Sequence, residues 1–182
     1  MAHAYSHLYR IPTTGLRFFT VYGPWGRPDM AYSIFSDSIL NGRPIQVFNN
    51  GNMKRDFTYI DDVVKGIVNA LNNPPSADEN WDGKEAPASS SSAPYKIYNL
   101  GNNKPVNLMR FIRLLEQNLG RTANIELKEM QAGDVMSTWA DIDNSIKELS
   151  YMPSINIEEG LSKFAAWYKN YYTVVGKPEI LV

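Results

Sequence analysis

Apolar residues recur along this chain at two spacings, which predict a succession of strands and helices. Near-continuous apolar runs at 14–22 and at 96–100, the latter within a strand predicted at 95–102, are typical of strands covered on both faces, as in a parallel sheet. Shorter strands are predicted at 45–51, 55–60 and 124–130. Helical spacing predicts helices at 1–10, 31–40, 61–73, 108–119, 141–149 and 157–172. Because strands alternate with helices, the pattern predicts an α/β fold.

Residues 75–94, PSADENWDGKEAPASSSSAP, interrupt this pattern. Their content of Pro, Ser and Ala is typical of a linker or surface loop. Trp81 is the only large apolar residue in the segment, and we expect it to hold the loop against the body of the protein. Since no internal repeat divides the remainder, we expect residues 1–182 to form a single region with 75–94 as a loop within it.

Composition then restricts the function classes. The 182 residues are 43% hydrophobic, which is enough to bury one core. Eighteen Lys and Arg against nineteen Asp and Glu leave a net charge of −1. We therefore expect no broad basic surface that would attract nucleic acid or an anionic membrane, and any anionic ligand must be bound by local groups.

The absence of cysteine excludes disulfides, thiolate catalysis and cysteine-ligated zinc, and it favours a reducing compartment. His3 and His7 stand at metal-ligand spacing on a helix, but no nearby carboxylate completes an HExxH pattern, which favours surface histidines. No apolar run approaches the ~18 residues that cross a bilayer, and the polar N-terminus is unlike a secretory signal. These features predict a cytoplasmic protein.

Residues 16–30, LRFFTVYGPWGRPDM, combine a buried strand with a loop rich in Gly and Pro. Proline stiffens this loop, which carries Arg27 beyond the end of the strand. Three more motifs follow in order along the chain: KRDFTYIDDVVKGIVNAL, YNLGNNKPVNLMRFI and MQAGDVMSTWADI.

Together the four motifs resemble the C-terminal, substrate-binding half of an extended short-chain dehydrogenase/reductase. The resemblance is to the NAD-dependent nucleotide-sugar epimerases and dehydratases, and most closely to the UDP-glucuronate 4-epimerases. It covers nearly all of the chain outside 75–94. It implies an α/β fold made of the last Rossmann-like strands and a small substrate-binding domain, and a function in inverting C4 of a UDP-sugar by transient oxidation.

The resemblance also implies that part of the family's machinery is missing. Family members carry a GxxGxxG turn that binds the dinucleotide and a catalytic Tyr-x-x-x-Lys pair, and neither occurs in this sequence. In the family, that pair lies on the helix that continues into MAHAYSHLY. We therefore expect a truncated epimerase that lacks the dinucleotide-binding half, is inactive alone and does not bind NAD without the rest of the enzyme.

The same resemblance assigns a nucleotide end to the substrate site. Arg55 would hold the pyrophosphate, for which a permanently charged fork of donors is suited. Phe48 and Gln46 would contact the uracil, and Asp134 would accept from the ribose hydroxyls. Gln131 stands where many relatives outside the uronate group have an arginine, so one phosphate contact is made differently. Without the motifs, the same residues would be a surface arginine, a core phenylalanine and a turn aspartate.

At the sugar end, the resemblance places Thr20 against the sugar and Phe18 beside the nicotinamide of the cofactor. Arg27 would lie near the C6 group, where a carboxylate gives it a bidentate partner and a neutral hydroxymethyl does not. This favours a uronate. The alternative is that Arg27 only anchors its loop through Asp29.

Asp61 and Asp62 could be mistaken for a catalytic carboxylate pair. Both stand in the first turn of the predicted helix 61–73, where carboxylates cap the backbone and complement the helix dipole. We therefore interpret both as capping residues.

Three functions stay open at this point. The first is the UDP-glucuronate-binding half of a 4-epimerase. The second is a fragment of a nucleotide-sugar 4,6-dehydratase or a UDP-glucuronate decarboxylase, and the third is a non-catalytic module that binds nucleotide sugars. A UDP-sugar is the expected small-molecule partner, and self-association is expected through exposed strands or through the helix at 1–10, because the family dimerises through the helix that ends there.

Overall fold

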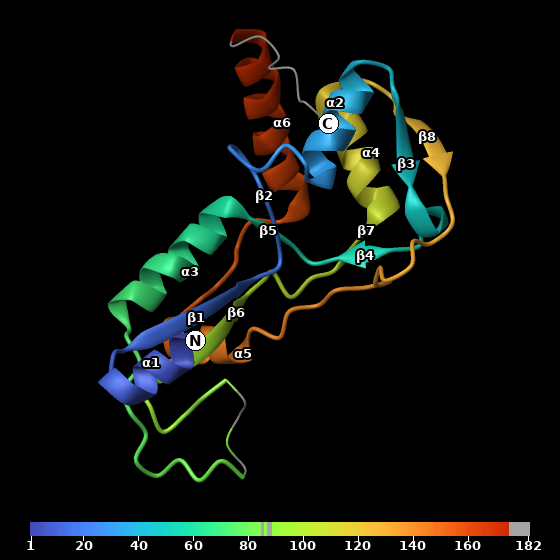
Figure 1. The fold of residues 1–182 in the computed structure, drawn as a ribbon. Coiled ribbons are helices and arrows are strands. Elements are labelled where there is room, and N and C mark those ends of the chain that lie inside the picture. The colour runs from blue at the N-terminus through green and yellow to red at the C-terminus, as the bar shows by residue number, and fades with distance from the viewer. Residues whose placement is uncertain (85, 87–88, 175–182) are drawn as a thin grey trace.

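The computed structural model describes residues 1–84, 86 and 89–174. Two groups of elements meet near the middle of the molecule, where two strands lie end to end (Figure 1). They are β1 (Thr13–Phe18) and β2 (Thr20–Tyr22). The predicted single strand at 14–22 is therefore wrong in one respect, because it is divided at Phe19.

The division marks a change of neighbour. β1 pairs in parallel with β6 (Tyr95–Leu100), whereas β2 pairs in parallel with β5 (Phe57–Tyr59). At the junction the backbone N–H of Phe19 donates to the carbonyl of Leu100 at 3.2 Å, and the N–H of Thr20 donates to the carbonyl of Asp56 at 3.2 Å.

The first group is called here the sheet layer. It consists of β1 and β6 with α1 (Ala2–Tyr9), α3 (Ile60–Asn72) and α5 (Asp143–Leu149). Figure 1 shows β1 and β6 between α3 and α1. Gly66 lets α3 approach the sheet, because a Cβ there would lie 2.8 Å from Leu100 Cδ1. The buried apolar residues of this layer are Val63, Ala70, Tyr98, Leu100, Ala140, Ile142, Leu149 and Tyr151.

The second group is called the helical lobe. It packs α2 (Ala31–Leu40), α4 (Leu108–Leu119) and α6 (Ile157–Val174) beside the parallel pair β3 (Pro44–Val47) and β8 (Asn124–Leu127). Its buried core is rich in aromatic rings and contains Tyr22, Tyr32, Phe35, Ile39, Ile45, Val47, Phe57, Tyr59, Val106, Phe111, Ile112, Leu115, Leu119, Ile157, Leu161, Phe164, Ala165 and Tyr168.

Local signals explain the ends of α4. Asn107 accepts from the backbone N–H groups of Met109 at 2.9 Å and Arg110 at 3.4 Å, which satisfies donors that have no partner inside the helix. Gly120 follows the last turn with φ of 76°, the left-handed conformation that ends helices and costs glycine little. The predicted helix 108–119 is confirmed to the residue.

Short elements connect the two groups. β4 (Lys54–Arg55) pairs antiparallel with β7 (Val106–Asn107), and the 3₁₀ turn η1 (Phe48–Gly51) follows β3. The predicted strand 55–60 is divided at Asp56. The Asp56 side chain is fully buried and accepts from the backbone N–H groups of Asn102, Asn103 and Ala140 at 2.9 to 3.0 Å. Asp56 thus ties the end of β6 to the segment that leads into α5.

A close contact between Gly160 and Tyr22 also positions α6. Gly160, in the first turn of α6, lies under the buried ring of Tyr22, and a Cβ at this position would be 1.9 Å from the Tyr22 hydroxyl oxygen. The absence of a side chain at this position therefore lets α6 pack against β2.

The capping interpretation of the two acidic residues in α3 is wrong as far as a capping hydrogen bond is concerned. Among the described residues, no side-chain hydrogen bond caps the N-terminus of α3, and Asp62 is buried. Its carboxylate accepts from the backbone N–H groups of Ser154 at 3.0 Å and Ile155 at 2.9 Å. Asp62 therefore fastens the segment before α6 to the sheet layer, whereas Asp61 stays exposed in the first turn.

No helix or strand occurs among the described residues of 75–94, and Trp81 is half-buried. Among the described residues, no helix combines the length and the apolar character that crossing a membrane requires. The expected self-association stays a prediction.

Candidate functional site

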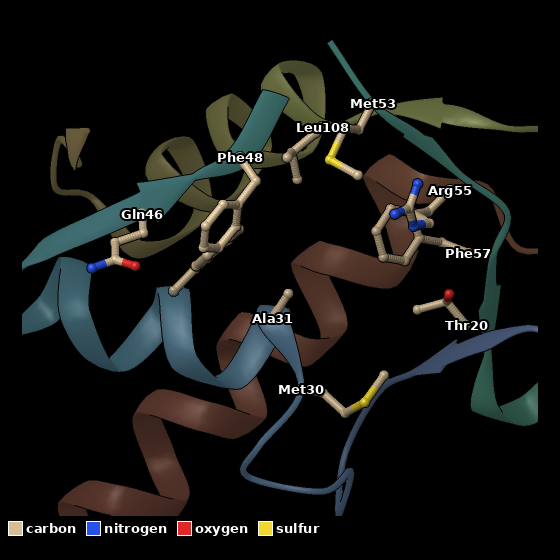
Figure 2. Close-up of a pocket in the computed structure, with 10 residues that line it drawn as sticks. Thr20, Met30, Ala31, Gln46, Phe48, Met53, Arg55, Phe57 and Leu108 are labelled. Carbon is tan, nitrogen blue, oxygen red and sulfur yellow. The ribbon is translucent and has the colours of Figure 1, made fainter. Parts of the chain in front are cut away.

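A cavity of about 260 Å³ lies in the helical lobe, where β3, α2 and the start of α4 face β4 and β5 (Figure 2). Four residues that the resemblance assigned to the substrate line it together: Thr20, Gln46, Phe48 and Arg55. They come from separate elements and are brought to one place by the fold. The other lining residues are Met30, Ala31, Phe35, Met53, Phe57 and Leu108.

Strand geometry places the residues at one end of the cavity. Along β3 the side chains alternate, so Ile45 and Val47 are buried while Gln46 is exposed between them. Phe48 follows directly, as the first residue of η1. Figure 2 shows Gln46 and Phe48 side by side at this end. A ring beside an amide offers apolar packing and hydrogen bonding to a flat polar group.

Arg55 and Thr20 lie at the other end of the cavity (Figure 2). The guanidinium of Arg55 is held by three partners. Nη2 donates to Asp134 Oδ1 at 2.7 Å, and Nη1 donates to the carbonyls of Lys54 at 2.9 Å and Met136 at 3.5 Å. The Arg55 side chain is largely buried, so its charge is concentrated at the cavity wall. The arrangement suits a ligand with a flat group at one end and an anion near the other.

Asp134 reaches the site through this ion pair. Its Oδ1 accepts from Arg55 and also from the N–H of Val135 at 2.8 Å. Asp134 does not itself line the cavity. The position of Asp134 is thus compatible with both interpretations. It can be a turn aspartate, and it can also make the nucleotide contact that the resemblance implied.

Arg27 does not line the cavity, and its side chain is mostly exposed. Its Nε pairs with Asp29 at 3.3 Å, which is the anchoring contact of the alternative interpretation. Its Nη2 also donates to the sulfur of Met30 at 3.2 Å, and Met30 lines the cavity. Phe18, at the end of β1, is 51% exposed and does not line the cavity.

Sequence reasoning missed the apolar walls of the cavity, and it missed Asp56, which stands between the lining residues Arg55 and Phe57. Met53, Phe57 and Leu108 carry no chemical signal that separates a cavity wall from a core. Asp56 had a stronger signal, since it is a lone carboxylate inside the apolar run DFTY, and such a group must be paired when buried.

Within the ranges that the structure describes, no three His, Asp or Glu side chains gather in a way that could hold a metal ion.

Comparison with known proteins gives the chain its family. Residues 1–101 match the model of the "NAD dependent epimerase/dehydratase family". Protein CapI of Staphylococcus aureus is 50% identical over 172 residues, which cover 94% of this chain and 52% of that protein. A probable UDP-glucuronate 4-epimerase of Rhizobium meliloti is 47% identical over 173 residues, covering 94% of this chain and 51% of that protein.

Comparison with solved structures points to the same family. The crystal structure of the UDP-glucuronic acid 4-epimerase from Bacillus cereus, in complex with UDP-glucuronic acid and NAD, superposes with a TM-score of 0.77 and 31% sequence identity. The match covers 94% of this chain and 49% of that one. The α/β elements are thus those of an extended short-chain dehydrogenase/reductase, and the chain spans about half the length of the curated relatives it matches. The chain belongs to the NAD dependent epimerase/dehydratase family.

Proposed function

We propose that this chain is the part of a UDP-glucuronate 4-epimerase that binds the nucleotide sugar. The observation that carries the proposal is the cavity with Gln46 and Phe48 at one end and Arg55 and Thr20 at the other. A UDP-sugar has the matching order of groups, because a flat base is followed by a pyrophosphate and then by a sugar. The similarity to UDP-glucuronate 4-epimerases supports this choice of ligand.

In this proposal each end of the cavity has one task. Phe48 packs against the uracil while Gln46 hydrogen-bonds its polar edge. Arg55 binds the pyrophosphate, and its contact with Asp134 fixes the direction of the guanidinium before the ligand arrives. Asp134 would accept from a ribose hydroxyl with Oδ2, since its described contacts end on Oδ1.

The sugar end sets the specificity. Thr20 hydrogen-bonds the sugar, and Arg27 exchanges its contact with Asp29 for the C6 carboxylate of a uronate. A neutral hexose would leave Arg27 with Asp29 and Met30 of its own loop as its partners. We therefore propose UDP-glucuronate as the preferred ligand over UDP-glucose.

The residues of this chain bind and orient, and they do not complete the cofactor site. The sequence offers no GxxGxxG turn for a dinucleotide, and Phe18 is the only residue assigned to the nicotinamide. We propose that the 182-residue chain mixed with UDP-glucuronate and NAD does not form the 4-epimer, and turnover by the purified chain would contradict this.

Calorimetric titration tests the binding proposal. We expect UDP to bind the wild-type chain and Arg55→Ala to weaken UDP about 10- to 100-fold, because a charge-assisted hydrogen bond to phosphate is lost. Arg43→Ala is the matched control, since Arg43 pairs with Asp37 and does not line the cavity. Equal loss in both variants, or no binding by the wild type, would refute the proposal.

Arg27→Ala tests the choice of sugar in the same assay. We expect this variant to lose the preference for UDP-glucuronate over UDP-glucose while it still binds UDP. A wild-type chain that binds both sugars equally would instead favour a less selective nucleotide-sugar module.

A further inference from the structure

Trp25 links the loop between β2 and α2 to the helix α6. Its ring centroid lies 5.5 Å from that of Trp167 and 5.1 Å from that of Tyr171, both on α6. In Figure 1 the segment between β2 and α2 runs beside α6. Trp25 belongs to the same GPWGRP motif that carries Arg27.

The backbone at this position is unusual. Trp25 has φ of 62°, in the left-handed region that bulky side chains rarely adopt. Such a conformation persists only where the surroundings hold it. Next to it, Gly26 is pressed against α2, because a Cβ there would be 1.9 Å from the hydroxyl oxygen of Tyr32. The loop is thus held on one side by α6 and on the other by α2.

The surface that receives Trp25 is fixed to the core. Trp167 and Tyr171 stack with centroids 5.2 Å apart, and Trp167 also contacts Phe164. Phe164 is fully buried and meets the ring of Tyr32 edge to face at 5.2 Å. The connected rings of Phe164, Trp167 and Tyr171 therefore support the loop both at Trp25 and, through Tyr32, at Gly26.

The loop ends at the cavity. Two residues after Trp25, Arg27 pairs with Asp29 and donates to the sulfur of Met30, and Met30 and Ala31 line the cavity. Figure 2 shows Met30 on the segment that leads into α2, on the side of the cavity where Thr20 lies. A shift of Trp25 would therefore move the groups at the sugar end and leave Gln46 and Phe48 in place.

We infer that Trp25 is a positioning residue whose packing on Trp167 and Tyr171 holds Arg27 and Met30 at the sugar end of the cavity. The inference rests on the proposed function in taking the ligand to be a UDP-sugar. It adds that the selectivity for the sugar depends on contacts made by α6, although neither Trp167 nor Tyr171 lines the cavity.

The first test needs no ligand. Trp25 is 75% exposed, so its replacement by alanine leaves no cavity in the core. In hydrogen exchange followed by mass spectrometry, we expect Trp25→Ala to raise the exchange rates of residues 23–31 about tenfold, and Trp25→Phe to restore most of the protection. Asn170→Ala, an exposed change on the same helix, should leave these rates unchanged. Unchanged exchange in Trp25→Ala would overturn the inference.

The second test compares two ligands. We expect Trp25→Ala to raise the Kd for UDP-glucuronate about tenfold and to leave the Kd for UDP within about twofold, because the uracil and phosphate contacts stay in place. Equal weakening of both ligands, or of neither, would overturn the inference. A wild-type chain that binds no UDP would refute the proposed function instead, and the exchange experiment would then decide the role of Trp25 by itself.

Discussion

The helices α3 and α4 share an apolar periodicity but differ in what covers it. In α4 the apolar residues at 108, 111, 112, 115 and 119 all face the core or pack against it. In α3 one side is buried against the sheet, whereas Val64, Ile67, Val68 and Leu71 form a second apolar side that is exposed. Periodicity thus predicts a helix and its apolar face, but not what packs against that face.

The helical lobe and the sheet layer also differ in how well their apolar residues are covered. The helical lobe encloses a large aromatic core and carries the candidate site, while the sheet layer has a small core. The sheet layer also exposes Tyr5, Leu8 and Tyr9 on α1. Clusters of exposed apolar residues of this kind are uncommon on monomers. The helical lobe, which carries the candidate site, therefore also has the larger buried core.

Core truncation gives the largest expected effect. Phe111 is fully buried and stacks on Phe57 with centroids 4.3 Å apart. We expect Phe111→Ala to lower the free energy of unfolding by ~3–5 kcal/mol. Leu71→Ala, at a position that is 78% exposed, should change it by less than about 0.5 kcal/mol. Urea denaturation measures both, and similar losses would show that the exposed side of α3 is covered in solution.

The junction between the two groups gives the next effect. Asp56→Ala removes a buried carboxylate and leaves the backbone N–H groups of Asn102, Asn103 and Ala140 without their acceptor. We expect a loss of about 3 kcal/mol in the free energy of unfolding. Asp61→Ala, an exposed acidic residue nearby, should cost only a few tenths of this amount. Equal losses would mean that Asp56 does not organise the junction.

A pH dependence in the sheet layer is the smallest effect. Burial raises the pKa of Glu148, but hydrogen bonds from Lys96 and Tyr98 outweigh burial and hold this pKa below the ordinary value of 4.5. Because the folded-state pKa is depressed, ionised Glu148 stabilises the fold above pH 4.5, and this contribution is lost as the pH falls through the folded-state pKa.

Glu148→Gln removes that titration and tests it. The difference in unfolding free energy between the wild type and Glu148→Gln should be constant above about pH 5.5 and should shrink as the pH falls below 4.5. Denaturation curves at a series of pH values measure it. A difference that is independent of pH across this range would contradict the assignment.

Much of the fold could be predicted where local signals mark an element. The helices 31–40 and 108–119 agree with the structure to the residue, because Asn41 and Gly120 end them. The break at Phe19 could not be predicted, since the apolar run is continuous and the change of neighbour depends on Leu100 and Asp56. Asp62 was misinterpreted for the same reason, because its partners Ser154 and Ile155 are remote in sequence.

The candidate site, too, could be predicted only in part. Gln46, Phe48, Arg55 and Thr20 were named from motifs, and the structure brings them to one cavity, while their roles stay predictions. The walls formed by Met53 and Leu108 could not be named, because an apolar side chain that faces a cavity has the same sequence pattern as one in a core. Only the packing of elements distinguishes the two.

The contact of Gly160 with Tyr22 has a consequence for anyone who would engineer this protein. Rules of helix propensity recommend alanine in place of glycine inside a helix, for a gain of about 1 kcal/mol. Here the added methyl group would collide with a buried phenol, so the substitution would push α6 outward together with its aromatic face. A stabilisation library should therefore keep glycine at position 160.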